Sequence, residues 1–134
     1  MVTHMGQAPA DHVVLTFNST FDLVRIGPDG RRETVPFKIP QTKVLVVTDV
    51  DWQMNPPMVG QKFHRLRMTI VNLETNEENT AFESSAVLND LGQGGINVGM
   101  TSGFVVSSKA KIKVDPPSIA TGYTVIIRGY LTRE

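Results

Sequence analysis

Hydrophobic and polar residues alternate with a period of two along most of the chain from residue 13 onward. In residues 109–114, Ala110, Ile112 and Val114 alternate with three lysines, which is typical of a strand with one face buried and the other in water. Gly, Pro, Asn and Asp separate such segments, and none keeps a helical period for three turns. The pattern predicts about ten short strands, over residues 13–17, 21–26, 33–37, 43–52, 63–71, 80–87, 96–100, 103–106, 109–114 and 123–131.

Two of these predicted strands are apolar on both faces. In residues 43–52, strict alternation places Val44, Val46, Val50 and Trp52 on one face, which we assign to the core. A second apolar face needs another covering layer or a neighbouring subunit. The residues that fall on the second faces, and that we predict to form an interface between copies of the chain, are Leu45, Val47, Ile126 and Tyr130.

Turn residues organise these strands into one domain. The sequence Gly27-Pro28-Asp29-Gly30 favours a tight turn, so residues 21–26 and 33–37 are expected to pair as an antiparallel hairpin. Many short strands without helices indicate an all-β protein, and we predict a two-sheet antiparallel β-sandwich that is jelly-roll-like. Residues 13–134 form this single domain, preceded by a flexible leader over residues 1–12.

Composition and charge exclude several classes of function. The 134 residues include 13 Lys and Arg against 13 Asp and Glu, without a basic run, so nucleic acid is not an expected partner. No apolar run is long enough to span a membrane. The chain has no Cys, which removes disulfides, thiolate metal sites and a cysteine nucleophile. The compartment stays undetermined, with an exported or cell-surface location slightly favoured.

Few residues suggest chemistry. His64 is the single histidine of the predicted domain, which leaves a catalytic triad or metal site incomplete, and we predict no enzyme activity, metal or cofactor. Asp49 and Asp51 share a face where a strand ends, and their carboxylates could bind a ligand. Trp52 and Asn55 follow, and a tryptophan can either anchor the core or stack against a sugar.

Three stretches together resemble small bacterial all-β proteins of unassigned function: IPQTKVLVVTDVDW (39–52), TSGFVV (101–106) and IRGYL (127–131). The closing strand is also similar to the last strand of tumour-necrosis-factor-like jelly rolls. That resemblance covers about ten residues and transfers no catalytic residue. It implies a homotrimer packed through aromatic and aliphatic sheet faces.

Two functions follow from these observations. The first is a non-enzymatic, self-associating β-sandwich that acts as a structural or recognition module, with a trimer favoured. The alternative is a carbohydrate-binding module, because jelly rolls present loops and sheet faces that hold sugars. Its predicted ligand-binding residues are Asp49, Asp51, Trp52 and Asn55.

Overall fold

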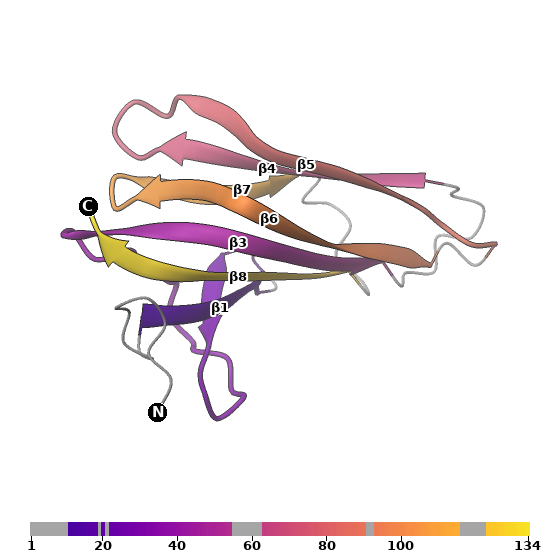
Figure 1. The fold of residues 1–134 in the computed structure, drawn as a ribbon, viewed down its shortest axis with the longest axis horizontal. Helices are drawn as coiled ribbons and strands as arrows, with labels where there is room; N and C mark the ends of the chain where they lie inside the picture. Colours follow the sequence, from indigo (N-terminus) through magenta and orange to yellow (C-terminus); the bar gives the residue numbers. More distant parts are fainter. Residues whose placement is uncertain (1–10, 19, 21, 55–62, 91–92, 116–122) are drawn as a thin grey trace.

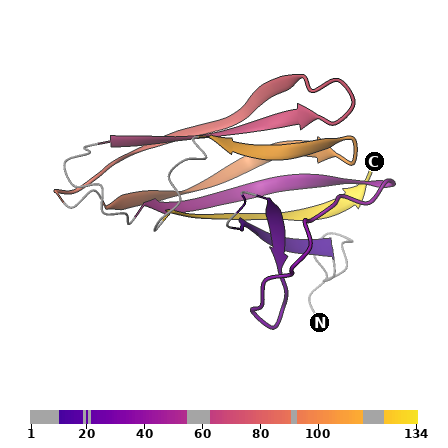
Figure 2. The ribbon, with the colours of Figure 1, turned by 180° about the vertical axis from the view of Figure 1, so that it is seen from behind.

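The strands of the protein lie in two antiparallel sheets (Figures 1 and 2). The computed structural model describes residues 11–18, 20, 22–54, 63–90, 93–115 and 123–134. Its strands are β1 (His12–Phe17), β2 (Leu23–Ile26), β3 (Lys43–Met54), β4 (Phe63–Asn72), β5 (Glu78–Val87), β6 (Gly94–Ser107), β7 (Ala110–Asp115) and β8 (Tyr123–Arg133). The predicted all-β, two-sheet antiparallel architecture is confirmed.

The larger sheet has five strands in the order β2-β1-β8-β3-β6, and the smaller has three in the order β5-β4-β7. Ser108 and Lys109 separate β6 from β7, so the chain passes from the larger sheet to the smaller one at this turn. An isolated bridge between Ile26 and Arg32 adds one further contact beside β2. Each predicted strand except 33–37 lies within or overlaps one of these elements.

The predicted hairpin partner over residues 33–37 is not a strand. The Gly27 N–H donates to the Arg31 carbonyl, which forms the expected turn, and the chain then makes the bridge at Arg32. Beyond it, the Glu33 N–H donates to the Arg25 carbonyl and the Phe37 N–H donates to the Leu23 carbonyl, but residues 34 and 35 bend and no continuous ladder forms. Pro36 lacks the N–H that a ladder requires. Phe37 packs against the core while it keeps its hydrogen bond to β2.

The predicted strands 96–100 and 103–106 are one strand, β6, with an irregularity in its middle. Val47 pairs with Phe104 and Asp49 pairs with Gly99, so residues 100–103 lie opposite Thr48 alone. Gly103 has φ of 72°, a conformation that side chains disfavour. A Cβ added at Gly103 would also overlap the Val47 carbonyl oxygen, so the sequence needs glycine here.

The same irregularity corrects the predicted faces of β3. The register shifts between Val47 and Asp49 against both neighbouring strands, which makes Thr48 a bulge residue. A single inserted residue reverses which face each following side chain occupies. The inner face of β3 therefore carries Leu45, Val47, Val50 and Trp52, all fully buried in the core between the sheets.

The expectation that Leu45 and Val47 lie opposite Trp52 is therefore wrong. Both side chains are fully buried within the chain's own core and are inaccessible to a partner. Val46, which we assigned to the core face, points to the other side of the sheet and is absent from the main core cluster. The core itself joins inner residues of both sheets, among them Leu15, Leu66, Met68, Val114 and Ile127.

The first strand begins one residue before the predicted domain. His12 opens β1, and the Lys43 Nζ atom lies 2.6 Å from the Asp11 carboxylate. Residues 11 and 12 are thus part of the fold, while residues 1–10 of the predicted leader lie outside the described residues. No helix in the described part of the chain is long and apolar enough to cross a bilayer.

Candidate functional site

The outer face of the larger sheet, which points away from the smaller sheet, carries rows of side chains paired across strands. Residues directly opposite one another on antiparallel strands project from the same face. One row crosses four strands through Val105, Val46, Tyr130 and His12. Val46 is buried, Tyr130 is half-buried and Val105 is 53% exposed, so the part of the row from Tyr130 to Val105 is an apolar strip that continues to the edge of the sheet.

The next row pairs Asp49 of β3 with Arg128 of β8, and Asn97 reaches this pair from the row that follows. An Arg128 guanidinium nitrogen lies 2.7 Å from an Asp49 carboxylate oxygen, and the Asn97 amide donates to both oxygens of the same carboxylate at 3.2 and 3.3 Å. The carboxylate of Asp49 is therefore engaged by one cation and one amide. It links three strands of the sheet, β6, β3 and β8, and its predicted role in ligand binding stays a prediction.

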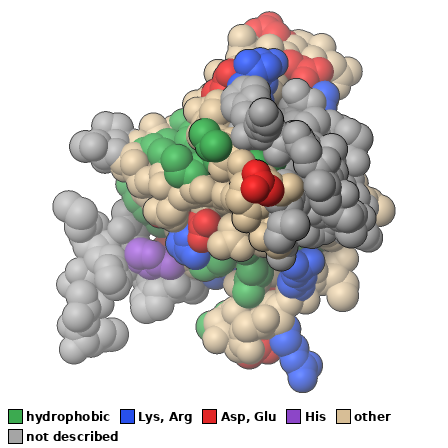
Figure 3. All heavy atoms as spheres, turned by 90° about the vertical axis from the view of Figure 1, so that its right-hand side faces the viewer, with side chains coloured by type: hydrophobic (Ala, Val, Ile, Leu, Met, Phe, Trp, Pro, Cys, Tyr) green, Lys and Arg blue, Asp and Glu red, His purple; other side chains and the backbone are tan. Residues whose placement is uncertain are grey.

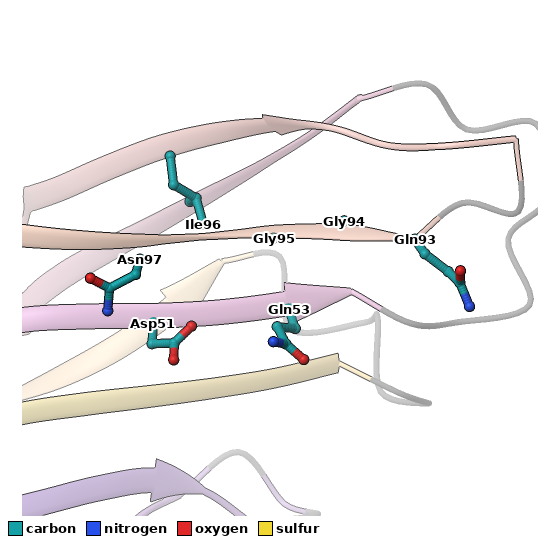
Figure 4. Close-up of a pocket in the computed structure, with 7 residues that line it drawn as sticks. All are labelled: Asp51, Gln53, Gln93, Gly94, Gly95, Ile96 and Asn97. Atoms are coloured by element: carbon teal, nitrogen blue, oxygen red, sulfur yellow. The ribbon is translucent and has the colours of Figure 1, made fainter.

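A polar groove follows where β3 ends and β6 begins (Figure 4). It has a volume of about 540 Å³. The carboxylate of Asp51 and the amides of Gln53, Asn97 and Gln93 lie along it, while Ile96 points to the other side of the sheet. Gly94 and Gly95 complete its lining. The groove offers donors and acceptors without an aromatic surface.

Trp52 takes no part in this groove. Its ring is fully buried on the inner face of β3, and the indole N–H donates to the Ser84 hydroxyl of β5 at 2.6 Å. The prediction that Trp52 anchors the core is confirmed, whereas its assignment as a ligand-binding residue is wrong. A buried indole N–H needs an acceptor, and Ser84 supplies one from the opposite sheet. Asn55 lies outside the described residues.

One sequence signal pointed to Ser84: it lies two positions from both Phe82 and Ala86, which are apolar and prove to be buried on the same strand. Ser84 also pairs with the buried Leu66 of β4. A polar residue in an apolar row is expected to have a partner across the core. Its identity could not be read from the sequence.

Of the four residues predicted for the subunit interface, Ile126 and Tyr130 lie half-buried on the outer face of β8. Ile126 shares a cross-strand row with Asp51, and Tyr130 belongs to the apolar strip. The other two, Leu45 and Val47, are in the core. The structure thus brings Asp49, Asp51, Ile126 and Tyr130 onto one face and separates them from Trp52.

The edges of the sheets differ in charge. The edge strands β2, β5 and β7 each carry charged side chains, including Arg25, Glu83 and Lys113. The fourth edge strand, β6, has 14 residues and contains no Lys, Arg, Asp, Glu or Pro. The end of the molecule where β6 begins also exposes hydrophobic side chains on one flank, apart from the charged groups above and below (Figure 3).

No group of three or more His, Asp or Glu side chains that could hold a metal ion occurs among the described residues. The predicted lack of enzyme activity is a separate matter and stays a prediction. No protein-family model matches the chain, and comparisons with curated proteins and with solved structures gave no significant match.

Proposed function

We propose that the protein is a non-enzymatic recognition or structural module that self-associates through the outer face of the larger sheet and its uncharged edge strand, β6. One observation carries this proposal. Of the four edge strands of the described fold, β6 alone lacks a charged residue. Exposed strand edges present unpaired backbone groups, and proteins that stay monomeric usually protect them with charges, prolines or short length.

The apolar strip is the surface that we expect the β6 edge of a neighbouring copy to contact. Val105 lies at the β6 end of the strip and Tyr130 lies two strands further in. In a ring of identical subunits, each copy presents one patch and receives another. The Val105 end of one copy would then pack against Tyr130 and Ile126 of the next. Tyr and Arg are common in interfaces, and Arg128 lies beside this surface. The trimer comes from the resemblance of the last strand and is part of the proposal.

We further propose a jelly-roll connection of the strands. In a jelly roll, the first strand pairs with the last, the third with the sixth and the fourth with the fifth. Pairs β1–β8, β3–β6 and β4–β5 support this assignment. The second strand is expected beside the seventh. Here β2 pairs with β1, and residues 36–41 face β7 across a cleft.

Light scattering coupled to size-exclusion chromatography tests self-association. We expect a mass three times the 14.7 kDa of the chain at micromolar concentration. Val105→Lys places a charge at the β6 edge and should yield monomers. Val87→Lys is the matched control, because Val87 is an 83% exposed valine on the β5 edge, and its mass should not change.

A monomeric wild-type protein would overturn self-association. A mass twice that of the chain would support two-fold pairing of β6 strands and overturn the ring. If Val105→Lys keeps the wild-type mass, the β6 edge is not the contact.

A carbohydrate-binding module is the second candidate. The polar groove supports it, because carboxylate and amide side chains such as Asp51 and Asn97 hydrogen-bond well to sugar hydroxyls. Trp52 contributes no stacking surface in this version. The proposal therefore rests on hydrogen bonding alone, and its ligand would be a hydroxyl-rich glycan without a requirement for an aromatic platform.

A further inference from the structure

The smaller sheet has an open edge along β7. In the described part of the chain, β7 pairs with β4 on one side and with no strand on the other. The Leu73 N–H donates to the Lys109 carbonyl at 2.9 Å, so these two residues form a hydrogen-bonded pair that continues the β4–β7 ladder. Such pairs alternate along an antiparallel ladder with pairs whose backbone groups point outward. The N–H and C=O groups of Ala110 and Ile112 therefore point to the open edge, and no described residue bonds to them.

This open edge borders a cleft with a volume of about 470 Å³. Four consecutive residues of β7, 110–113, line the cleft, although the side chains of a strand alternate between its two faces. The cleft is therefore bordered by the backbone edge of β7 and not by one face of the strand. Residues 36–39 line the cleft as well. The apolar lining outside β7 comprises Leu23, Pro36, Phe37, Ile39, Leu45, Leu73 and Val106.

The two faces of β7 differ in character along this edge. Ala110 and Ile112 point inward and pack in or against the core. Alternation places Lys111 and Lys113 on the outer face of the smaller sheet, where both are exposed and Lys113 lies 3.3 Å from Glu78. On the open side of β7, these two lysines occupy the positions at which the side chains of an antiparallel neighbour come closest. A strand added at this edge would thus turn every second side chain into the apolar cleft and the others toward the lysines.

We propose that the open edge of β7 binds an extended peptide segment of another protein, in which apolar residues alternate with acidic residues. The peptide adds to the smaller sheet as a fourth strand, antiparallel like every described strand pair. Its apolar side chains lie over Leu45, Val106 and Phe37, and its acidic side chains lie beside Lys111 and Lys113.

Charge decides between the occupants of this edge. Opposite charges on neighbouring strands attract, whereas like charges directly opposite each other destabilise the pair. The β7 strand of a second copy carries the same lysines and is therefore a poor partner for this edge. The β6 edge and the polar groove take no part in the site, so it is independent of the proposed function.

Isothermal titration calorimetry tests this proposal with a synthetic, end-capped peptide as long as β7, six residues, in which valine and glutamate alternate. We expect this peptide to bind, and the peptide with lysine in place of glutamate to bind more weakly. Lys111→Glu should reverse this preference, because it reverses the charge beside the added strand. N-methylation of the central valine removes an N–H that bonds to β7 and should raise the Kd about tenfold, which corresponds to the loss of about one hydrogen bond.

Arg31→Glu is the matched control. It makes the same change of charge at an exposed residue that does not line the cleft, so this variant should bind the glutamate peptide as the wild type does. Circular dichroism establishes that each variant is folded. Absence of binding by the folded wild-type protein would overturn the proposal, as would equal affinities of the N-methylated and unmodified peptides. An equal loss in Arg31→Glu and Lys111→Glu would mean that general surface charge, and not the β7 edge, attracts the peptide.

Amide hydrogen exchange followed by nuclear magnetic resonance locates the bound peptide. The N–H groups of Ala110 and Ile112 should exchange rapidly in the protein alone and slowly with the glutamate peptide bound. The Lys111 N–H, which bonds to β4, should exchange slowly in both states. Slow exchange of Ala110 and Ile112 without peptide would overturn the proposal, because the chain itself would already cover this edge. If that protection were lost on dilution, a second copy would be the occupant instead.

Discussion

The hydrogen bond between Trp52 and Ser84 predicts an energetic coupling between the two sheets. Trp52 belongs to β3 of the larger sheet and Ser84 to β5 of the smaller one, and the indole nitrogen lies 2.6 Å from the hydroxyl oxygen. The indole is fully buried, so water cannot replace a lost partner easily. We expect each residue to depend on the other for part of its contribution to stability.

Three variants separate the hydrogen bond from the packing. Trp52→Phe keeps an aromatic ring and removes the donor, and Ser84→Ala removes the acceptor. Each should lower the free energy of unfolding by about 1–3 kcal/mol, the usual cost of leaving a buried polar group without its partner. The double variant should lose clearly less than the sum of the two. A coupling energy of about 1 kcal/mol corresponds to one net hydrogen bond.

Trp52→Ala also removes the ring. Truncating a buried aromatic residue costs about 3–5 kcal/mol, which is a large share of the roughly 5–15 kcal/mol that stabilises a domain. This variant should therefore lower the melting temperature by many degrees or fail to accumulate as soluble protein. The comparison with Trp52→Phe shows how much of that loss belongs to packing.

Urea unfolding followed by far-ultraviolet circular dichroism measures these energies. Tryptophan fluorescence is unsuitable because Trp52 is the only tryptophan of the chain and every Trp52 variant lacks it, so the variants could not be compared by one signal. Ser85→Ala is the control, since Ser85 is the exposed neighbour on the same strand and its variant should unfold like the wild type. If the losses of Trp52→Phe and Ser84→Ala add within about 0.5 kcal/mol, the two side chains are not coupled and the reasoning fails.

Two further predictions concern β6 and the groove beside it. Gly103→Ala should lower the free energy of unfolding by about 2 kcal/mol or more, because φ is positive there and the added Cβ meets the Val47 carbonyl oxygen, whereas Gly99→Ala, with open space around it, should be nearly neutral in the same urea titration. Equal losses would show that the irregularity of β6 does not depend on Gly103. If the groove binds glycans, the Asp51→Ala variant should no longer bind to a glycan array, whereas the control variant Glu83→Ala should bind as the wild type does. The fluorescence of the buried Trp52 should not shift when the wild-type protein binds a glycan. A wild-type protein that retains no glycan would end the carbohydrate alternative.

The sequence alone was sufficient to predict the all-β, two-sheet architecture and most of the strands. Alternation in segments such as 109–114 indicates a strand with one buried and one solvent-exposed face. This signal lies within one segment, so it can be recognised without knowing which strands pair with it. The burial of Trp52 could be predicted only from its alternation with Val50, which shares its inner face, because Val44 and Val46 lie beyond the bulge and point to the other side. The bulge at Thr48 could not be predicted from the sequence, since a register shift is a property of two paired strands.

The tertiary structure decided everything that depended on that shift. Strict alternation put Leu45 and Val47 on a subunit interface, and one inserted residue in β3 moved them into the core beside Trp52. The joining of two predicted strands into β6, the partner of the indole N–H and the grouping of Asp49 with Arg128 and Asn97 also depend on cross-strand register. Register is set by pairing between segments far apart in the chain, and a local pattern of hydrophobic and polar residues carries no record of which segments meet.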